Sequence, residues 1–397
     1  MPPVSRNSTD KKRGWIRAKK FIISNARIIS PGVDKYGSVL IEGDKIAKIY
    51  ESGEKLPADI KIIDAGNAML MPGFIDVHCH GKAGADFCDT EDGSLKTVAD
   101  AKINEGVTSV FATTLTLPEA DLAVTCAQAA EYAGNRTGAK VPGIHLEGPF
   151  INPKCLGAQN PDFVQEPDAE MVKRLSAIYP VKRIAYAPEC GDGQGFAAKM
   201  IEMGIVPSGA HTAAKFEEFK AAYAKGLRHM THFCNQMTAL HHRDIGMVGA
   251  GLLLKDTVVE LICDLIHVSA PMVQLVFQTK GCDHIMLISD AMRAAGMPDG
   301  SYTLGGLPVT VENGAARLTS NGALAGSTLA ICDALKNVAK VTGLPLSELV
   351  KTTSYNAARE HNLPGLGKIE EGYTADLVLL SGDFKVQMVF IDGKRCK

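Results

Sequence analysis

The chain has 397 residues, which suits one large domain with a small accessory domain. Hydrophobic residues make up 46% of it and charged residues 22%, an ordinary balance for a globular protein. The net charge of −2 and the lack of a long basic run argue against a nucleic-acid partner, and no stretch of about 18 apolar residues is present that could span a membrane. The ten cysteines have no CxxC pairing, which is typical of reduced thiols, so we expect a cytoplasmic protein.

Both ends of the chain carry strand-like segments. Residues 1–17 are polar and basic, and we expect them to be a flexible extension. Residues 18–70 contain short apolar strands with turn residues between them, and residues 353–397 contain two more strand candidates, 377–380 and 385–391. The sequence therefore predicts one small β-sandwich domain that is built from both chain ends.

Residues 71–352 show a different pattern, in which short apolar strands alternate with helical stretches. The strand candidates around this block are 68–74, 109–112, 143–146, 184–187, 205–208, 229–232, 258–262 and 285–288. Such alternation predicts an α/β fold with parallel strands, and eight strands favour a closed (β/α)₈ TIM-like barrel over an open doubly wound sheet. No GxGxxG follows the first strand, which argues further against a dinucleotide-binding fold.

Metal-ligand side chains stand at the carboxyl ends of these strands, where barrel enzymes build their active sites. They are His78, His80, Glu147, His211, His232 and Asp290. Residues two apart in a strand face the same side, so the H-x-H pair directs two imidazoles into one barrel mouth. This set predicts one or two divalent metals, such as zinc or ferrous iron, with Glu147 able to bridge two ions.

Asp290 has a second expected role, because a carboxylate beside a metal-activated water can accept its proton and pass it on. We interpret five other histidines as surface residues or as supports for the ligands. They are His229, His241, His242, His284 and His361.

Several motifs resemble a known family. PGFIDVHCHG at 72–81 resembles the first-strand signature of the amidohydrolase superfamily, and HLEGPF at 145–150 resembles that of the N-acetylglucosamine-6-phosphate deacetylases. The landmarks around His211, His232 and Asp290 follow in the family's order. The resemblance implies that Glu147, His211 and His232 are metal ligands, that His78 and His80 hold a second metal, and that Asp290 is the catalytic aspartate.

The resemblance also implies a set of substrate contacts. They are Ala158, Gln159, Asn235, Gln236, Arg243, His267, Leu324, Ala325 and Gly326. In this family a phosphate-binding arginine can come from the neighbouring subunit, so we expect a homodimer in which Arg243 reaches the neighbouring site. Some family members have His where this chain has Gln159, and Gln236 stands where Ala is expected, which leaves gluco and galacto specificity open.

The expected activity is the metal-dependent hydrolysis of the acetamide of N-acetyl-D-glucosamine 6-phosphate to D-glucosamine 6-phosphate and acetate, in amino-sugar catabolism. The alternatives are a deacetylase of N-acetylgalactosamine 6-phosphate and another amidase of the superfamily. A homologue that has lost its chemistry is a third alternative, but the complete set of ligand residues argues against it.

Overall fold

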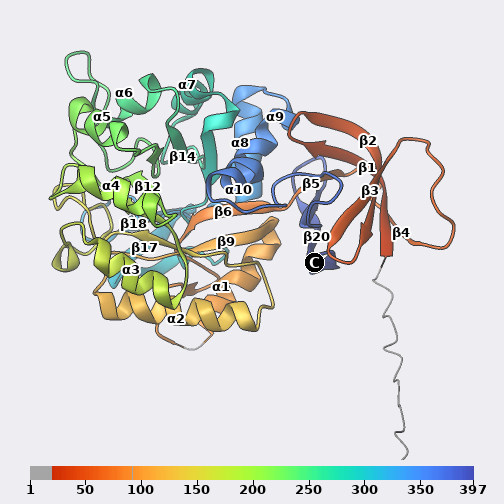
Figure 1. The fold of residues 1–397 in the computed structure, drawn as a ribbon, viewed down its shortest axis with the longest axis horizontal. Coiled ribbons are helices and arrows are strands. Elements are labelled where there is room, and N and C mark those ends of the chain that lie inside the picture. Colours follow the sequence, from red (N-terminus) through yellow and green to blue (C-terminus); the bar gives the residue numbers. More distant parts are fainter. Residues whose placement is uncertain (1–19, 92) are drawn as a thin grey trace, which may run out of the picture.

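The computed structural model describes residues 20–91 and 93–397. The expected flexible extension, residues 1–17, lies outside the described residues. Figure 1 shows two parts: a barrel surrounded by helices, and a strand-rich domain to one side in which the red N-terminal strands lie beside the blue C-terminal ones. The expected fold class is confirmed, because a sheet of eight parallel strands forms the barrel and a separate sheet gathers both chain ends.

The terminal sheet contains strands from both ends of the chain. Its members are β1 (Lys20–Ser30), β2 (Val33–Glu42), β3 (Lys45–Glu51), β4 (Lys61–Asp64), β5 (Met69–Pro72), β19 (Leu377–Leu380), β20 (Val386–Ile391) and β21 (Lys394–Arg395). The two ends meet where β19 pairs antiparallel with β5, with Leu379 opposite Leu70. Hydrogen bonding runs through one continuous sheet, which encloses its own apolar cluster that includes Ile23, Ile41 and Phe390.

The barrel strands are all parallel to their neighbours. They are β6 (Phe74–Cys79), β9 (Val107–Thr113), β10 (Ile144–Glu147), β11 (Val181–Tyr186), β12 (Val206–Gly209), β13 (His229–Met230), β14 (Val258–Ile262) and β15 (Ile285–Ile288). The first and last strands adjoin through a bridge between Cys79 and Ala291, and the amide of Asp290 donates to the carbonyl of His78 at 2.9 Å. This bond ties two predicted site residues together at the seam of the barrel.

The predicted strand 68–74 is divided in the structure. β5 belongs to the terminal sheet, and the barrel begins only with β6. The division falls at Gly73, whose amide donates to the carbonyl of Asp376, while the next amide, of Phe74, donates to Gly106. A Cβ on Gly73 would lie 2.2 Å from the side chain of Thr108, so the chain passes between the two domains at a point that only glycine fits.

Helices cover the outside of the barrel. They are α1 (Ser94–Lys102), α2 (Glu119–Gly134), α3 (Ala169–Ile178), α4 (Gly193–Glu202), α5 (Phe216–Ala224), α6 (Gly246–Leu253), α7 (Ala270–Lys280), α8 (Ile331–Thr342), α9 (Leu346–Val350) and α10 (Asn356–Glu360). In α8, for example, Ile331, Ala334, Leu335 and Val338 are buried at helical spacing and pack in the main core.

Short elements complete the connections. They are β7 (Gly81–Lys82) paired with β8 (Ala85–Asp86), the 3₁₀ turns η1 (Ile103–Glu105), η2 (Pro161–Phe163) and η3 (Cys282–His284), and the π-helical segment η4 (Lys351–Tyr355).

A three-stranded antiparallel sheet follows the last barrel strand and is an element that the sequence reading missed. It consists of β16 (Gly300–Leu304), β17 (Leu307–Glu312) and β18 (Ala315–Leu318). Its two hairpins turn at Gly305-Gly306 and Asn313-Gly314, all with positive φ, and such dipeptides are the sequence signal of two-residue hairpins. The sheet has its own apolar cluster and contributes one wall of the cavity described below.

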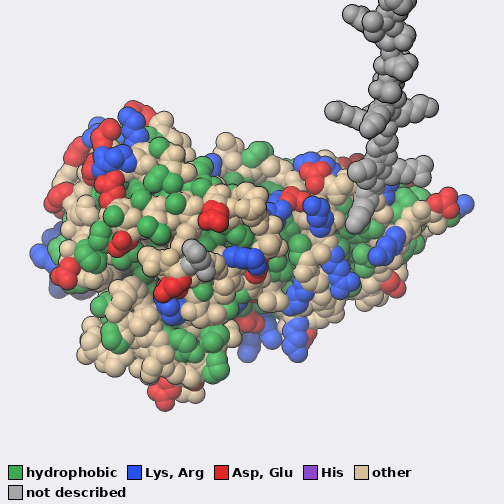
Figure 2. All heavy atoms as spheres, turned by 90° about the horizontal axis from the view of Figure 1, so that it is seen from below, with side chains coloured by type: hydrophobic (Ala, Val, Ile, Leu, Met, Phe, Trp, Pro, Cys, Tyr) green, Lys and Arg blue, Asp and Glu red, His purple; other side chains and the backbone are tan. Residues whose placement is uncertain are grey.

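The surface carries charges of both signs. On the face in Figure 2, Lys and Arg side chains are interspersed with Asp and Glu over both domains, in keeping with the net charge of −2. Among the described residues, no helix is long and apolar enough to cross a membrane. All ten cysteines are free thiols.

Candidate active site

Six predicted metal-ligand residues meet at one end of the barrel. They are His78, His80, Glu147, His211, His232 and Asp290, and each is at least nine-tenths buried. Three of them leave their strands with a left-handed backbone, at φ 44° for His211, 30° for His232 and 48° for Asp290. This conformation is uncommon for residues with a side chain and is often found at functional sites, where the surrounding structure maintains it.

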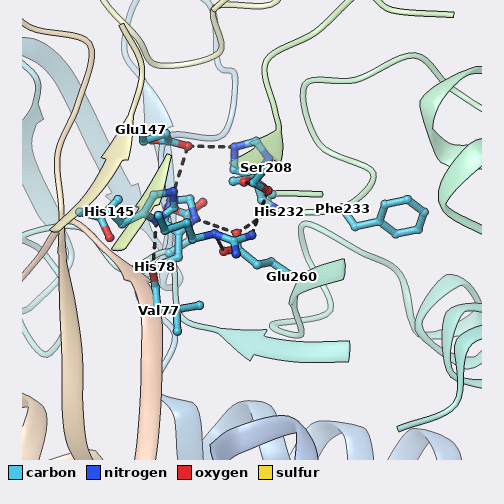
Figure 3. Close-up of polar contacts among 12 residues, drawn as sticks. Val77, His78, His145, Glu147, Ser208, His232, Phe233 and Glu260 are labelled. Carbon is cyan, nitrogen blue, oxygen red and sulfur yellow. Dashed lines mark hydrogen bonds and ion pairs between the residues drawn. The ribbon is translucent and has the colours of Figure 1, made fainter. Parts of the chain in front are cut away.

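Glu147 lies at the centre of the cluster. Its Oε1 is 3.2 Å from Nε2 of His211, 3.0 Å from Nε2 of His232 and 3.4 Å from Nε2 of His78. Its Oε2 is 3.1 Å from Nε2 of His80. One carboxylate therefore contacts both the H-x-H pair and the histidines that follow β12 and β13. Figure 3 shows Glu147 beside His78 and His232.

Asp290 closes the other side of the H-x-H pair. Its Oδ1 is 3.3 Å from Nε2 of His80 and 3.5 Å from Nε2 of His78. Asp290 thus faces the same pair of imidazoles as Glu147, but it follows β15, whereas Glu147 ends β10.

The hydrogen bond at Nδ1 of His211 shows that the other nitrogen of this ring, Nε2, is free to bind a metal ion. Nδ1 of His211 lies 2.8 Å from the carbonyl of Cys155 and must carry a proton, because a carbonyl only accepts. In the neutral ring, Nε2 of His211 then presents a lone pair to a carboxylate oxygen of Glu147, 3.2 Å away. Two acceptors at that distance repel unless a proton or a metal ion lies between them. Imidazole and carboxylate together are ligands that zinc and iron accept, so the donor set fits a divalent metal.

The cluster also attracts positive charge. Burial lowers the pKa of His80, but its hydrogen bonds to Asp290 and Glu147 outweigh burial and raise that pKa well above its usual value. Burial raises the pKa of Glu147, but His78 and its hydrogen bonds to the other histidines hold it well below its usual value. Glu147 is therefore ionised and available as a ligand.

A cavity of about 330 Å³ opens above the cluster. Its lining includes five of the six metal-ligand candidates; His78 is buried beneath them. The expected substrate contacts that line the cavity are Ala158, Gln159, Asn235, Gln236, His267, Leu324 and Gly326. Ala325 does not line it, because its side chain packs in the apolar cluster of the three-stranded sheet.

Arg243 lies outside this cavity. Its Nη1 is 2.7 Å from Nε2 of His242, and its side chain lines a separate surface hollow with Lys215 and Glu217. Within one chain, therefore, the structure does not bring Arg243 to the other predicted substrate contacts.

His267 is oriented by a carboxylate. Its Nδ1 lies 2.7 Å from Oδ2 of Asp264 and must donate to it, so Nε2 is the nitrogen left for a ligand in the cavity. Burial raises the pKa of Asp264, but the side chain of His267 and the backbone amides of Ile266 and His267 together outweigh it and lower that pKa. The carboxylate therefore stays ionised and holds the orientation of the His267 ring.

The sequence reading missed four residues of this region. Arg317 of β18 is the one Lys or Arg among the described residues that line the cavity. Glu260, Arg183 and His145 are fully buried next to the metal-ligand candidates. A signal existed for Glu260, because it is the one charged residue inside the predicted barrel strand 258–262.

Among the other histidines, His229 is buried and lies 3.2 Å from Glu360, while His241 and His242 are exposed. His361 is buried beside Arg183, with its Nε2 3.5 Å from the guanidinium. His284 is partly buried near the carbonyl of Lys280. None of these five rings lines the cavity.

Comparison with known proteins identifies the family to which this chain belongs. Residues 69–396 match the model of the Amidohydrolase family. The N-acetylglucosamine-6-phosphate deacetylase of Lysinibacillus sphaericus is 39% identical over 90% of this chain and 93% of the relative. The N-acetylgalactosamine-6-phosphate deacetylase of Escherichia coli O157:H7 is 35% identical over 85% of this chain and 90% of the relative.

A solved structure gives the same result. It is an Asp-to-Ala variant of the N-acetyl-D-glucosamine-6-phosphate deacetylase from Mycobacterium smegmatis, in complex with N-acetyl-D-glucosamine-6-phosphate. It aligns with a TM-score of 0.89 at 28% identity, over 95% of this chain and 99% of that one. The chain therefore belongs to the amidohydrolase family, within the branch of N-acetylglucosamine-6-phosphate deacetylases and their relatives.

Proposed function

We propose that the protein hydrolyses the acetamide of N-acetyl-D-glucosamine 6-phosphate to D-glucosamine 6-phosphate and acetate. The observation that carries this proposal is the convergence of four imidazoles and two carboxylates on the floor of one cavity, around Glu147. The relatives named above support the substrate class. A cytoplasmic location, in keeping with ten free thiols, is part of the proposal.

We propose a site for two divalent metals, zinc or ferrous iron, in which Glu147 is shared. His211 and His232 would hold one ion, and His78, His80 and Asp290 the other. A divalent metal in such a site supplies Lewis acidity, which lowers the pKa of water to about 7 and polarises a carbonyl.

Asp290 is the proposed acid–base group. As the water oxygen bonds to the acetyl carbon, Asp290 accepts the water's proton; as the carbon–nitrogen bond breaks, it gives that proton to the departing amine. The products are acetate and the free amino sugar, and Asp290 returns to its ionised form. Its position supports this role, because it lines the cavity and touches the H-x-H pair at the same time.

The phosphate group needs positive charge and hydrogen-bond donors. His267, held by Asp264, and the amide of Asn235 line the cavity and are suitable donors. Arg317 is the cation of the same cavity within one chain. Arg243 would contribute only from a second subunit, so we propose a homodimer in which it reaches the neighbouring site. A guanidinium suits phosphate because its fork of donors matches two phosphate oxygens.

Acetate release from N-acetylglucosamine 6-phosphate tests the proposal, with the unphosphorylated sugar and the galacto 6-phosphate as comparisons. We expect the gluco 6-phosphate to give the highest kcat/KM. A higher value for the galacto isomer would favour the second candidate function, N-acetylgalactosamine-6-phosphate deacetylation, the activity for which the E. coli relative is named. Equal rates with and without phosphate would refute both and point to another amidase of the family.

A further inference from the structure

An acidic residue lies behind the metal-ligand cluster, inside the barrel. Glu260 is the one charged residue of β14, which reads Val-Val-Glu-Leu-Ile, and it is fully buried. Figure 3 shows its carboxylate directed at His78, on the side of the ring away from Glu147. A buried charge costs free energy unless it is paired, so this glutamate needs an account.

Glu260 contacts two of the candidate ligands with a single oxygen. Its Oε2 lies 3.0 Å from Nδ1 of His78 and accepts the backbone amide of His232 at 3.2 Å. Beside an ionised carboxylate, Nδ1 of His78 carries the proton. In the neutral ring, Nε2 then presents its lone pair to Glu147 and Asp290, which is the orientation a metal ligand needs.

Arg183 holds Glu260 in its ionised form. Its Nε is 2.8 Å from Oε1 of Glu260, and its Nη2 donates to Oγ of Ser208 at 2.9 Å. Both partners of this ion pair are fully buried. The guanidinium therefore fixes the position of the carboxylate from the side opposite His78.

His78, His145 and Glu260 also lie close enough together to suggest a metal site of their own. Two contacts argue against it. The guanidinium of Arg183 already neutralises Glu260 and would repel a second cation. Nδ1 of His78, which faces Glu260 at 3.0 Å, carries a proton and offers no lone pair on that side of the ring. The group is better understood as a support for His78.

We propose that Glu260 is a positioning residue for the second metal: it fixes the Nδ1-protonated tautomer and the ring orientation of His78, and Arg183 holds it in place. The inference rests on the proposed two-metal site, but it does not depend on which substrate is cleaved. Carboxylates behind a ligand histidine raise the basicity of the ring, and their loss typically weakens metal binding about 10–100-fold.

The test counts zinc on metal-free protein, by titration with Zn²⁺ followed by elemental analysis. The unaltered chain should bind two ions. Glu260→Gln, which keeps the shape and removes the charge, should bind the first as tightly as before and the second roughly 10–100-fold more weakly. Glu105→Gln is the matched control, because Glu105 is a buried carboxylate paired with Lys102 at 2.6 Å and is not among the contacts of the four ligand histidines. It should keep two tight ions.

A second measurement separates positioning from a general loss of structure. If Glu260 acts through His78, adding Glu260→Gln to His78→Ala should cause no further loss of zinc affinity. If Glu260→Gln alone does not fold, because Arg183 is left as an unpaired buried charge, the double variant Glu260→Gln/Arg183→Gln removes both charges and should show the same weakened second site.

The inference would be overturned if the Glu260 variants bound the second ion as tightly as the unaltered chain does. It would also be overturned if Glu260→Gln reduced zinc affinity further in the His78→Ala background. An unaltered chain that binds only one zinc would also overturn it, because His78 would then hold no metal. A deacetylase assay is independent of these results: a chain that binds two zinc ions but lacks the activity would refute the proposed function and leave the role of Glu260 intact.

Discussion

Gln159 donates a hydrogen bond through Nε2 to Oε2 of Glu147 at 2.7 Å, and its Oε1 accepts the amide of Thr116 at the same distance. The side chain is thus fixed at both ends, and its orientation follows, because the backbone amide can only donate and the ionised carboxylate can only accept. A residue expected to contact substrate also supports the carboxylate at the centre of the metal cluster.

Replacing Gln159 by Leu should therefore weaken metal binding as well as activity. The change removes one hydrogen bond from Oε2 of Glu147 and leaves the amide of Thr116 unpaired in a buried position. Loss of a hydrogen bond to a charged group costs about 1.5–3 kcal/mol, so we expect kcat/KM to fall roughly 10–100-fold. Kinetics and zinc content should be measured together. A Leu variant that keeps full zinc affinity and changes only KM would show that Gln159 serves the substrate alone.

Metal removal should abolish activity. Four imidazoles and two carboxylates converge where the proposed reaction needs a Lewis acid. Dialysis against a strong chelator should reduce acetate release to background, and zinc or ferrous iron should restore it. Unchanged activity in protein shown by elemental analysis to be metal-free would refute the mechanism.

Asp290→Asn should reduce kcat and preserve the fold. General acid–base catalysis is typically worth about 10²–10⁴-fold, and an amide cannot accept the water's proton. The measurement is kcat across a metal titration, because Asp290 also touches both histidines of the H-x-H pair. Recovery of the rate at saturating metal would show that Asp290 is only a ligand.

Arg317 and Arg243 should each affect the phosphorylated substrate and not the unphosphorylated one. Arg317→Ala and Arg243→Ala should each raise KM for the phosphorylated sugar roughly 10–100-fold, the usual effect of losing a charged hydrogen bond, and leave the unphosphorylated sugar nearly unaffected. Lys215→Ala is the control for Arg243, because both residues line the same surface hollow. If a substitution impaired the reaction of both sugars equally, that arginine would have a structural role instead.

Mixed dimers test whether Arg243 acts across subunits. An Arg243→Ala chain has an intact Asp290, and an Asp290→Asn chain has an intact Arg243. If Arg243 serves the neighbouring site, mixing the two impaired variants should restore up to half of the activity at low concentrations of the phosphorylated sugar, because one site per dimer is complete. No recovery in dimers shown to be mixed would contradict this arrangement.

Stability should fall in acid partly because of His361. Burial, with Arg183 beside it, lowers the pKa of His361 from 6.5 to about 3. Between these values the unfolded chain binds a proton that the folded chain does not, so the free energy of unfolding decreases as pH falls, by about 1.4 kcal/mol per pH unit. His361→Gln should reduce that slope by this amount in urea titrations between about pH 4 and 6. Parallel slopes would contradict the prediction.

Sequence patterns alone predicted the architecture and the candidate metal ligands. Strand–helix alternation and the position of His78, His80, Glu147, His211, His232 and Asp290 at strand ends are local features, readable because parallel barrel strands all direct their carboxyl ends to one mouth. Glu260 could also have been noticed, as a charge within an apolar strand. Its contact with His78 could not have been predicted, because β14 and β6 are far apart in sequence and come close, with β15 between them, only when the barrel closes.

Which side chains share the cavity depends on tertiary contacts between segments that are distant in the sequence. The chain crosses from the terminal sheet to the barrel at Gly73, a choice made by bonds to Asp376 and Gly106, distant in sequence. Arg317 reaches the cavity because a three-stranded sheet folds over the barrel mouth, whereas Arg243 points to a different hollow. Sequence patterns report the period of each element and the face it buries; they do not report which loops meet, because that depends on long-range packing of apolar clusters.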